Sequence, residues 1–492
     1  MKQKTKRFIC VGLAIVLIFL CGCQQSPLQN VVTSKNDGSF NASLVQTATE
    51  DKGTNKIQTA EYSEVFTSTD RTVEFRLQIS EELLDRNMPV VEVVPHYLSE
   101  KDVQRVALAL FGDIDFYETE PRLAAVYSKD EILEKINRWS EYANTSALSN
   151  LYGDTINIQF QETLVKQFIE TYTELYETAT DESVYEQCQW QFKKDSYYWV
   201  SAEEIAGQNL ENENDVIEAS VKIGNINYNF SASKRNKDDF KLNNISAYLY
   251  AGTSPNSIDE RIFRAWLCRT EEPTEKQIAS VKAKAESILQ QIQLGDWFVD
   301  ECYVEKTYYG DTPEYVICVN AVPVLNNIPA IRRPQLTNLK SEDIYASNYY
   351  LTDVNFEFSA NGELVSFWMY SPIDIKNTVN DNAEVLSIEG LVELAKNYLA
   401  LSDYYEYGFG PMIDSTNEEL SCVVNITRLD YNLTRVKVPN SDESYYYVPG
   451  IALSGNVEYY GKESGDIYFK NDNVTLVTLN GVDGSIVNTT NE

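Results

Sequence analysis

The chain has 492 residues, of which 74 are Asp or Glu, 41 are Lys or Arg and one is His, so the formal net charge is −33. A field of this sign repels nucleic acid and anionic membrane surfaces, which excludes binding through phosphate contacts. An apolar fraction of 43%, with 12% aromatic residues, excludes a disordered chain. The length corresponds to about three domains.

The N-terminus has the pattern of a secretion signal. Lys2, Lys4, Lys6 and Arg7 precede an uncharged apolar segment from Phe8 to Leu20. A basic segment followed by an apolar segment of this length is typical of a signal peptide. A transmembrane helix needs about 18 or more apolar residues, so an uncleaved anchor is the less favoured alternative.

Leu20-Cys21-Gly22-Cys23 resembles the bacterial lipobox. The resemblance implies cleavage between Gly22 and Cys23, attachment of acyl chains such as palmitate to Cys23, and loss of Cys21 with the signal peptide 1–22. Cleavage would remove four cations and take the net charge to −37. Residues 23–60 are polar and are predicted to form a flexible tether. The protein is therefore expected on the outer face of the cell membrane, held by its lipid.

An N-terminal α+β domain is predicted over residues 61–255. Ser99 with Asp102, and Ser128 with Glu131, have the spacing of helix capping residues, and a third apolar stripe follows at 164–175. Strands are expected at 61–79, 90–94, 189–192, 197–200, 219–223, 225–230 and 245–250. The segment 251–256, Ala-Gly-Thr-Ser-Pro-Asn, marks the end of this domain.

The second half of the chain is predicted to contain two similar modules, at 256–378 and 379–492. Each begins with a helix, capped at Thr274 and Ser387, and continues into strands. The strands are expected at 297–308, 315–324, 354–367, 422–434, 445–460 and 476–487. Asn361-Gly362 and Asp483-Gly484 lie 122 residues apart and predict type I′ turns. The fold class is α+β with mainly antiparallel sheets.

Several segments together resemble an uncharacterised lipoprotein family of Gram-positive, clostridial-type bacteria. These are the lipobox, residues 31–38 (VVTSKNDG), and residues 91–95 (VEVVP) before a helix that ends in 109–113 (ALFGD). The segment 476–487 also resembles the last hairpin of PepSY-like and YycI-like extracytoplasmic modules. The PepSY resemblance implies restraint of a partner protein rather than catalysis, and neither resemblance implies a catalytic residue.

The chemistry-bearing residues argue against familiar enzyme classes. His96 is the only imidazole, so every His-dependent catalytic arrangement must use it, and a surface or turn histidine is the favoured interpretation. The sequence has no GxSxG, HExxH, P-loop or GxGxxG motif. Asp113, Asp115, Glu118 and Glu120 could together bind Ca²⁺ or Mg²⁺, but they lack EF-hand spacing, so a solvated acidic loop is favoured. No metal and no cofactor is predicted.

The cysteines after Cys23 are odd in number and form no zinc or CxxC pattern. Cys302 and Cys318 lie on the two arms of a predicted hairpin centred on 309–313. A disulfide between them is one interpretation, and two free buried thiols are the favoured one.

Thirty-three tyrosines, several in adjacent pairs, are assigned mainly to sheet packing and in part to binding. The favoured function is a non-catalytic envelope lipoprotein that binds or regulates an envelope protein. The alternative is an envelope enzyme that acts on a glycan through paired carboxylates. Flat tyrosine-bearing sheet faces would favour binding, whereas a deep cleft with two close carboxylates and aromatic rings would favour the enzyme. A solute-binding protein is a third class, but the alternating βα pattern that it requires is missing.

Overall fold

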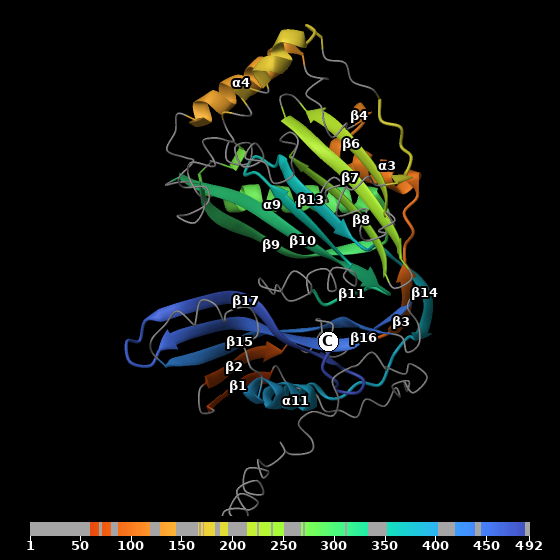
Figure 1. The fold of residues 1–492 in the computed structure, drawn as a ribbon. Coiled ribbons are helices and arrows are strands. Elements are labelled where there is room, and N and C mark those ends of the chain that lie inside the picture. The colour runs from red at the N-terminus through yellow and green to blue at the C-terminus, as the bar shows by residue number, and fades with distance from the viewer. Residues whose placement is uncertain are drawn as a thin grey trace, which may run out of the picture.

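The computed structural model describes residues 60–67, 71–79, 87–118, 128–143, 166, 169–170, 172–182, 187–194, 214–223, 226–237, 240–249, 267–268, 271–309, 312–332, 352–401, 419–437 and 444–487. These residues form two sheets whose strand pairs are antiparallel with one exception, and helices that cover them (Figure 1). The predicted α+β class is confirmed. Within these ranges, no helix is long and apolar enough to span a membrane.

The larger sheet contains ten strands from the middle of the chain. Its order is β11-β10-β12-β13-β8-β7-β6-β4, with β9 paired to β10 and β5 paired to β6. The bounds are β4 Phe116–Glu118, β5 Lys193–Lys194, β6 Asn214–Ile223, β7 Ile226–Lys237, β8 Phe240–Leu249, β9 Asp296–Tyr309, β10 Thr312–Leu325, β11 Ile328–Pro329, β12 Asp353–Phe358 and β13 Leu364–Tyr370.

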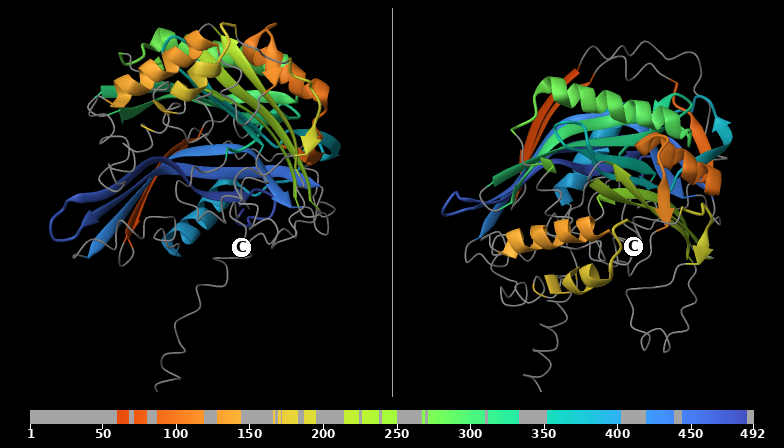
Figure 2. Two further views of the ribbon diagram at one scale, coloured as in Figure 1. Left: turned by 45° about the horizontal axis from the view of Figure 1, so that its top comes forward. Right: turned by 90° about the horizontal axis from the view of Figure 1, so that it is seen from above.

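Helices α3 (Glu100–Phe111) and α9 (Glu275–Ile292) pack on the outer face of the larger sheet (Figure 2). Each begins at a capping box, formed by Ser99 with Asp102 and by Thr274 with Gln277. Such caps satisfy backbone N–H groups that have no partner within the helix. The apolar side chains of both helices share one core with Phe230, Phe356 and other sheet residues. Short-range sequence signals therefore place these helices correctly.

The smaller sheet joins the two ends of the described chain. Its seven strands run in the order β1-β2-β15-β16-β3-β14, with β17 also paired to β16. The bounds are β1 Ala60–Thr67, β2 Arg71–Ile79, β3 Val90–Pro95, β14 Ile373–Asn380, β15 Leu420–Lys437, β16 Tyr445–Gly461 and β17 Ile467–Asn480. Helix α11 (Ile388–Leu401) covers the face that points away from the larger sheet (Figure 1).

The sheets do not follow the domain boundaries predicted at 255/256 and 378/379. Strands β1 to β3 belong to the predicted N-terminal domain, yet β2 pairs with β15 and β3 pairs with β16 and β14. Strand β8 of the same domain pairs with β13. The boundary 378/379 lies inside β14. Strand pairing between distant segments is set by tertiary packing, and the local composition used to place the boundaries does not report it.

The predicted recurrence of elements is present, although the two copies lie in different sheets. The order helix, long strand, long strand, third strand and turn occurs as α9, β9, β10 and β12, with the two-residue β11 inserted before β12, and again as α11, β15, β16 and β17. Helix α4 (Lys129–Ala143) also begins as predicted, because Ser128 and Glu131 hydrogen-bond reciprocally.

The turn type predicted for both modules is wrong. A type I′ turn needs positive φ at both central residues, but only Gly362 (φ 80°) and Gly484 (φ 73°) have it, and neither Asn361 nor Asp483 does. Gly362 N–H donates to Ser359 O at 2.9 Å, which closes a type I turn followed by a glycine bulge. A positive φ at two successive residues, Asn326 and Asn327, occurs instead between β10 and β11.

Four strand predictions also need correction. The segment 61–79 is divided into the antiparallel strands β1 and β2, and the segment 476–487 leaves strand β17 at Asn480 and enters a turn. Residues 189–192 are not a strand, whereas the adjacent Lys193–Lys194 form β5. The segment 354–367, expected as one strand, is divided by the Gly362 turn into β12 and β13. The segment 197–200 lies outside the described residues.

Candidate functional site

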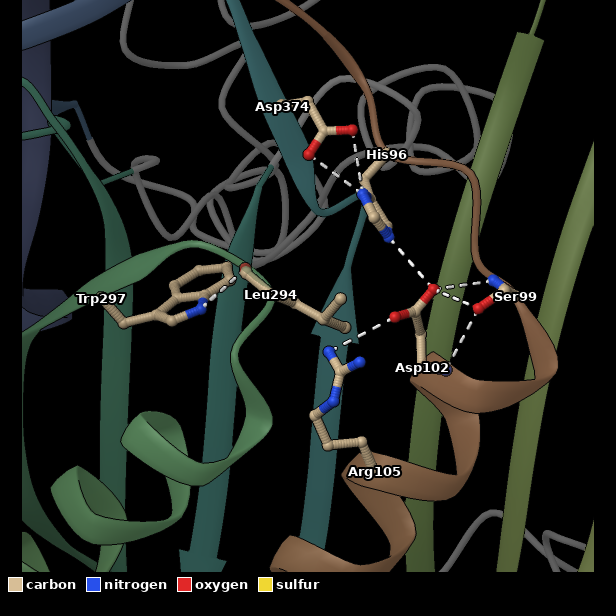
Figure 3. A network of polar contacts seen from close by, with 7 residues as sticks. All are labelled: His96, Ser99, Asp102, Arg105, Leu294, Trp297 and Asp374. Atoms are coloured by element: carbon tan, nitrogen blue, oxygen red, sulfur yellow. Dashed lines mark hydrogen bonds and ion pairs between the residues drawn. The ribbon is translucent and has the colours of Figure 1, made fainter.

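His96 lies at the end of β3 and connects three elements. Its backbone N–H donates to Pro372 O at 2.8 Å, just before β14. Its ring atom Nδ1 lies 2.9 and 3.0 Å from the two carboxylate oxygens of Asp374 on β14. Its Nε2 lies 3.3 Å from Asp102 Oδ2 on α3 (Figure 3). The side chain is 23% exposed, so the predicted turn histidine is a half-buried bridge between two carboxylates.

Asp102 is the common acceptor on the α3 side of this His96 cluster. Ser99 Oγ donates to Asp102 Oδ2 at 2.6 Å, Ser99 N donates at 2.9 Å, and Arg105 Nη1 lies 3.4 Å from Oδ1. Burial alone would raise the pKa of Asp102, but hydrogen bonds from Ser99 and His96 hold that pKa below its usual range. Asp102 is therefore a well-supported anion at the start of α3, where the helix dipole also favours negative charge.

The residue types Ser, His and Asp meet here without the geometry of a catalytic triad. In a triad the serine hydroxyl donates to the imidazole, which then acts as base. Ser99 instead donates to Asp102, and both ring nitrogens of His96 face carboxylates. A carboxylate only accepts hydrogen bonds, so neither carboxylate can donate a proton to the ring as a serine hydroxyl does in a triad. The cluster fixes β3, α3 and β14 to one another.

A cavity of about 780 Å³ lies beside the His96 cluster and shares Asp374 with it. Its walls come from the C-terminal half of α9, the turn at Gln293–Gly295, the start of β9, the end of β10 and the start of β14. Gln293 (φ 54°) ends α9 in the left-handed conformation, and Gly295 (φ 90°) redirects the chain into β9. This abrupt turn leaves room between α9, which packs on the larger sheet, and β14, which is a strand of the smaller sheet.

The cavity lining combines negative charge with exposed apolar surface. Glu286, Asp296 and Asp374 supply three carboxylates, and Lys282 supplies one ammonium group. Phe298 and Ile375 are 48% and 49% exposed, which is unusual for large apolar side chains. Trp297 donates its indole N–H to Leu294 O at 3.1 Å, so its ring orientation is fixed (Figure 3). The cavity therefore offers both charge and apolar contact to a ligand.

A second cavity, of about 450 Å³, is lined by Asp300, Glu301, Arg332, Arg428 and Asp430, which together with Asn320 form the Arg332 cluster. Arg332 pairs with Glu301 on β9, and Arg428 on β15 lies 3.3 Å from Asp300 and 2.8 Å from Asp430. The cluster crosses from the larger to the smaller sheet. Its arginines already have carboxylate partners, so it joins the sheets rather than offering free cations.

The Asn320 side chain completes this cluster. With its amide oxygen toward Arg332, it accepts from Arg332 Nη2 at 2.8 Å and donates to Asn355 Oδ1 at 2.7 Å. Burial lowers the pKa of Arg332, and burial raises the pKa of Asp430 although Arg428 opposes that rise.

Cys302 and Cys318 are free thiols, which was the favoured interpretation, and the alternative disulfide between them does not form. The β9–β10 register places Cys302 opposite Val319 and Cys318 opposite Tyr303. Successive residues in a strand point to opposite faces, so the two sulfurs lie on different sides of the sheet. Burial raises the pKa of both thiols, which keeps them protonated and unreactive.

The acidic set predicted as a possible Ca²⁺ or Mg²⁺ site does not converge. Glu118 pairs with Lys193 at 2.8 Å and accepts from Gln189 N at 2.7 Å, while Asp113 and Asp115 are exposed. Glu120 lies outside the described residues. Among described side chains, three potential metal ligands gather only at Glu305, Cys318 and Glu357. There Cys318 Sγ donates to Glu305 Oε2 at 3.5 Å, which accounts for the contact without a metal.

Of the other predicted features, some lie within the described residues and some lie outside them. Cys21, Gly22 and Cys23 lie outside the described residues, as does the tether. Of the tyrosine pairs, Tyr447 and Tyr459 are buried in the sheet while their neighbours Tyr446 and Tyr460 are more exposed, which is the alternation expected in strands. No local sequence pattern indicates the cavity, because Asp374 lies far along the chain from Glu286 and Asp296.

Comparisons with known proteins add little to this description. No family model matches the chain, and no curated protein matches it. One solved structure, an uncharacterized protein from Eubacterium rectale ATCC 33656, aligns over 87% of this chain and 93% of its own, with 9% sequence identity and a TM-score of 0.38.

Proposed function

We propose that this protein is a lipid-anchored, extracytoplasmic binding protein of a Gram-positive cell envelope, and that the 780 Å³ cavity is its ligand site. The anchor rests on the basic and apolar segments of the signal peptide and on the lipobox cysteine, Cys23. The binding role rests on the cavity. A concave site with apolar walls and a few polar groups is the usual form of a ligand site.

One observation favours binding over catalysis. Both polar clusters beside the cavities already have their charged groups paired within the protein, and the Ser99 hydroxyl caps a helix instead of facing a base. A nucleophile needs an adjacent base, and a general base needs a free acceptor atom. Carboxylates are present in the lining, but the one hydroxyl among its described residues, on Thr352, donates to Ser371 O at 2.7 Å instead of to a base.

The second candidate is a glycan-cleaving enzyme, which the cavity also favours in part. It contains carboxylates together with Trp297 and Phe298, as such an enzyme would. However, the acid of a glycosidase is kept protonated by an apolar environment. Glu286, Asp296 and Asp374 are all exposed to solvent, so none of them has that environment.

The anchor is tested by mass spectrometry of the native N-terminus and by membrane fractionation. We expect an acylated Cys23 in the wild type, and release of the protein from the membrane in Cys23→Ala. Cys21→Ala is the matched control and should leave the mature protein unchanged. An intact initiating methionine on the native product would refute the anchor.

The cavity is tested by placing a photo-crosslinking amino acid at position 298 and, as a control, at position 468. Phe298 and Tyr468 have similar exposure, 48% and 42%, but Tyr468 lies on β17, away from the cavity. Irradiation on intact cells should give a discrete adduct at position 298 and little at 468. Equal labelling at both positions would refute a ligand site here. Release of reducing sugar from purified cell wall would instead support the enzyme.

A further inference from the structure

The cavity beside the His96 cluster is more specific than a general binding site. We propose that it takes a short, extended peptide segment of a partner, with a basic side chain at Asp374 and Asp296 and a neighbouring apolar side chain against Phe298 and Ile375. This inference rests on the proposed binding function and names the ligand class.

The charge of the cavity lining and of the whole chain favours a cationic ligand. Three carboxylates and one ammonium line the cavity, and the whole chain carries a formal charge of −33. The long-range field therefore draws cations toward the protein and repels anions. Asp296 and Glu286 make no ion pair with another described residue, so their charges are available to a ligand.

His96 prepares Asp374 for this role. It contacts both oxygens of the carboxylate through Nδ1, yet the Asp374 side chain remains 58% exposed. The carboxylate is thus held in one orientation while the acceptor positions away from the imidazole stay open. A fixed anion costs less ordering entropy on binding than a mobile one. His96 is a positioning residue in this proposal.

Apolar contact points to a peptide rather than a small cation. Phe298 and Ile375 come from different sheets and line the same cavity, and Trp297 lies next to Phe298 in the sequence. Aromatic faces attract Lys and Arg side chains and also pack against apolar ones. A metal ion or simple amine would leave this surface exposed to water.

The strand edges at the cavity suit an extended segment. Among the described strands, β9 pairs only with β10 and β14 pairs only with β3. Both strands therefore have an edge whose backbone groups can pair with an added chain. The β14 pairing shifts register between Ile375 and Asn377, which interrupts the ladder and limits an added chain to a short segment.

The test measures binding to the full mature protein in detergent by fluorescence anisotropy. The probes are the labelled peptide Leu-Arg-Phe-Arg-Leu, its neutral counterpart Leu-Gln-Phe-Gln-Leu, and labelled tetra-N-acetylglucosamine. The variants are Asp374→Asn, Asp296→Asn and Phe298→Ala. Asp113→Asn removes the same charge from an exposed loop outside the cavity lining and is the matched control.

We expect the basic peptide to bind the wild type at least tenfold more tightly than the neutral peptide, with affinity that falls as salt is added. Asp374→Asn and Phe298→Ala should each weaken binding about tenfold, by loss of a charged hydrogen bond and of apolar contact. Asp113→Asn should bind as the wild type does. His96→Gln should weaken binding less than Asp374→Asn, because the carboxylate remains.

Other outcomes overturn the inference. Equal binding of the two peptides would remove the cationic requirement, and binding of the tetrasaccharide alone would show a glycan site. Absence of binding by all probes would refute the peptide proposal. The proposed function is judged separately, because an adduct at position 298 in cells would still demonstrate an occupied cavity.

Discussion

The Arg332 cluster connects the two sheets, whereas the His96 cluster connects the smaller sheet to α3, which packs on the larger sheet. The two clusters also differ in access to solvent. The Arg332 side chain is 13% exposed; its charge is paired with Glu301, and its guanidinium also donates to the Asn320 amide oxygen. The His96 cluster ends in Asp374, whose side chain is 58% exposed and lines the larger cavity. A buried charge network serves cohesion, because its groups cannot exchange partners without a large desolvation cost. A network with an exposed end can hold the fold and still meet a ligand.

The largest effect on stability is expected at the buried Arg332 cluster. Arg332→Ala removes one of the two arginines beside Glu301, since Arg428 Nη1 lies 3.6 Å from Glu301 Oε1, and it leaves the buried Asn320 amide oxygen without its donors. The free energy of unfolding should fall by about 2 to 3 kcal/mol, measured by urea denaturation, because hydrogen bonds from a charged group are lost at a buried acceptor. Arg76→Ala breaks a pair whose arginine is 72% exposed and should cost about 1 kcal/mol or less. Equal losses would show that burial does not distinguish the clusters.

A smaller, pH-dependent loss of stability is expected at the His96 cluster. Asp102→Asn should lower the free energy of unfolding by about 1 to 2 kcal/mol at pH 7, because it weakens a helix cap with charged hydrogen bonds. The pKa of Asp102 is lowered by folding, so its contribution is complete above the unfolded pKa of about 3.9 and is lost as the pH falls through the folded pKa. Thermal unfolding between pH 2 and 7 should therefore show the two proteins converging in acid.

For Asp430 we expect stability to change with pH in the opposite direction to that expected for Asp102, and by a smaller amount. Its pKa is raised by folding, so the native state holds the proton more tightly than the unfolded chain does. Stability contributed by the protonated form is present below the unfolded pKa of about 3.9 and is lost as the pH rises through the folded pKa. Relative to Asp430→Asn, the wild type should lose stability as the pH rises above about 4. Parallel curves for the Asp102 and Asp430 variants would contradict the contrast between the two sites.

The smallest effect is expected at Cys302 and Cys318, in the β9–β10 pair of the larger sheet. Because Cys302 and Cys318 are free and face opposite sides of the β9–β10 pair, a reducing agent should leave the unfolding temperature unchanged. Alkylation of the denatured protein without reduction should modify both residues. Protection of this pair from alkylation would show that a covalent link, and not only ion pairing, stabilises the sheet.

Local chemistry explains which parts of the fold could be predicted. Capping residues at Ser99, Ser128 and Thr274 act within four residues, so the starts of α3, α4 and α9 follow from sequence alone. Long alternating segments likewise predicted the main strands. The turn type at Asn361-Gly362 was wrong because a dipeptide does not report loop length, and loop length selects the turn.

Non-local chemistry explains what could not be predicted. His96 meets Asp374 across 278 residues, and no local pattern links them. The cavity depends on the contact between His96 and Asp374 and on the turn after α9. The domain boundaries failed for the same reason, since the sequence around β2 gives no indication that its partner is β15.

The parallel pairing of β2 with β15 also has a consequence for the order of folding. Arg71 and Cys422 are direct partners in this pair, although about 350 residues separate them along the chain. The smaller sheet cannot close until nearly the whole polypeptide has been synthesised, whereas most of the larger sheet comes from a continuous middle segment. Contacts of such long range slow folding and leave early strands exposed in the meantime. We therefore expect β1 to β3 to be the segments most in need of a chaperone while the chain emerges.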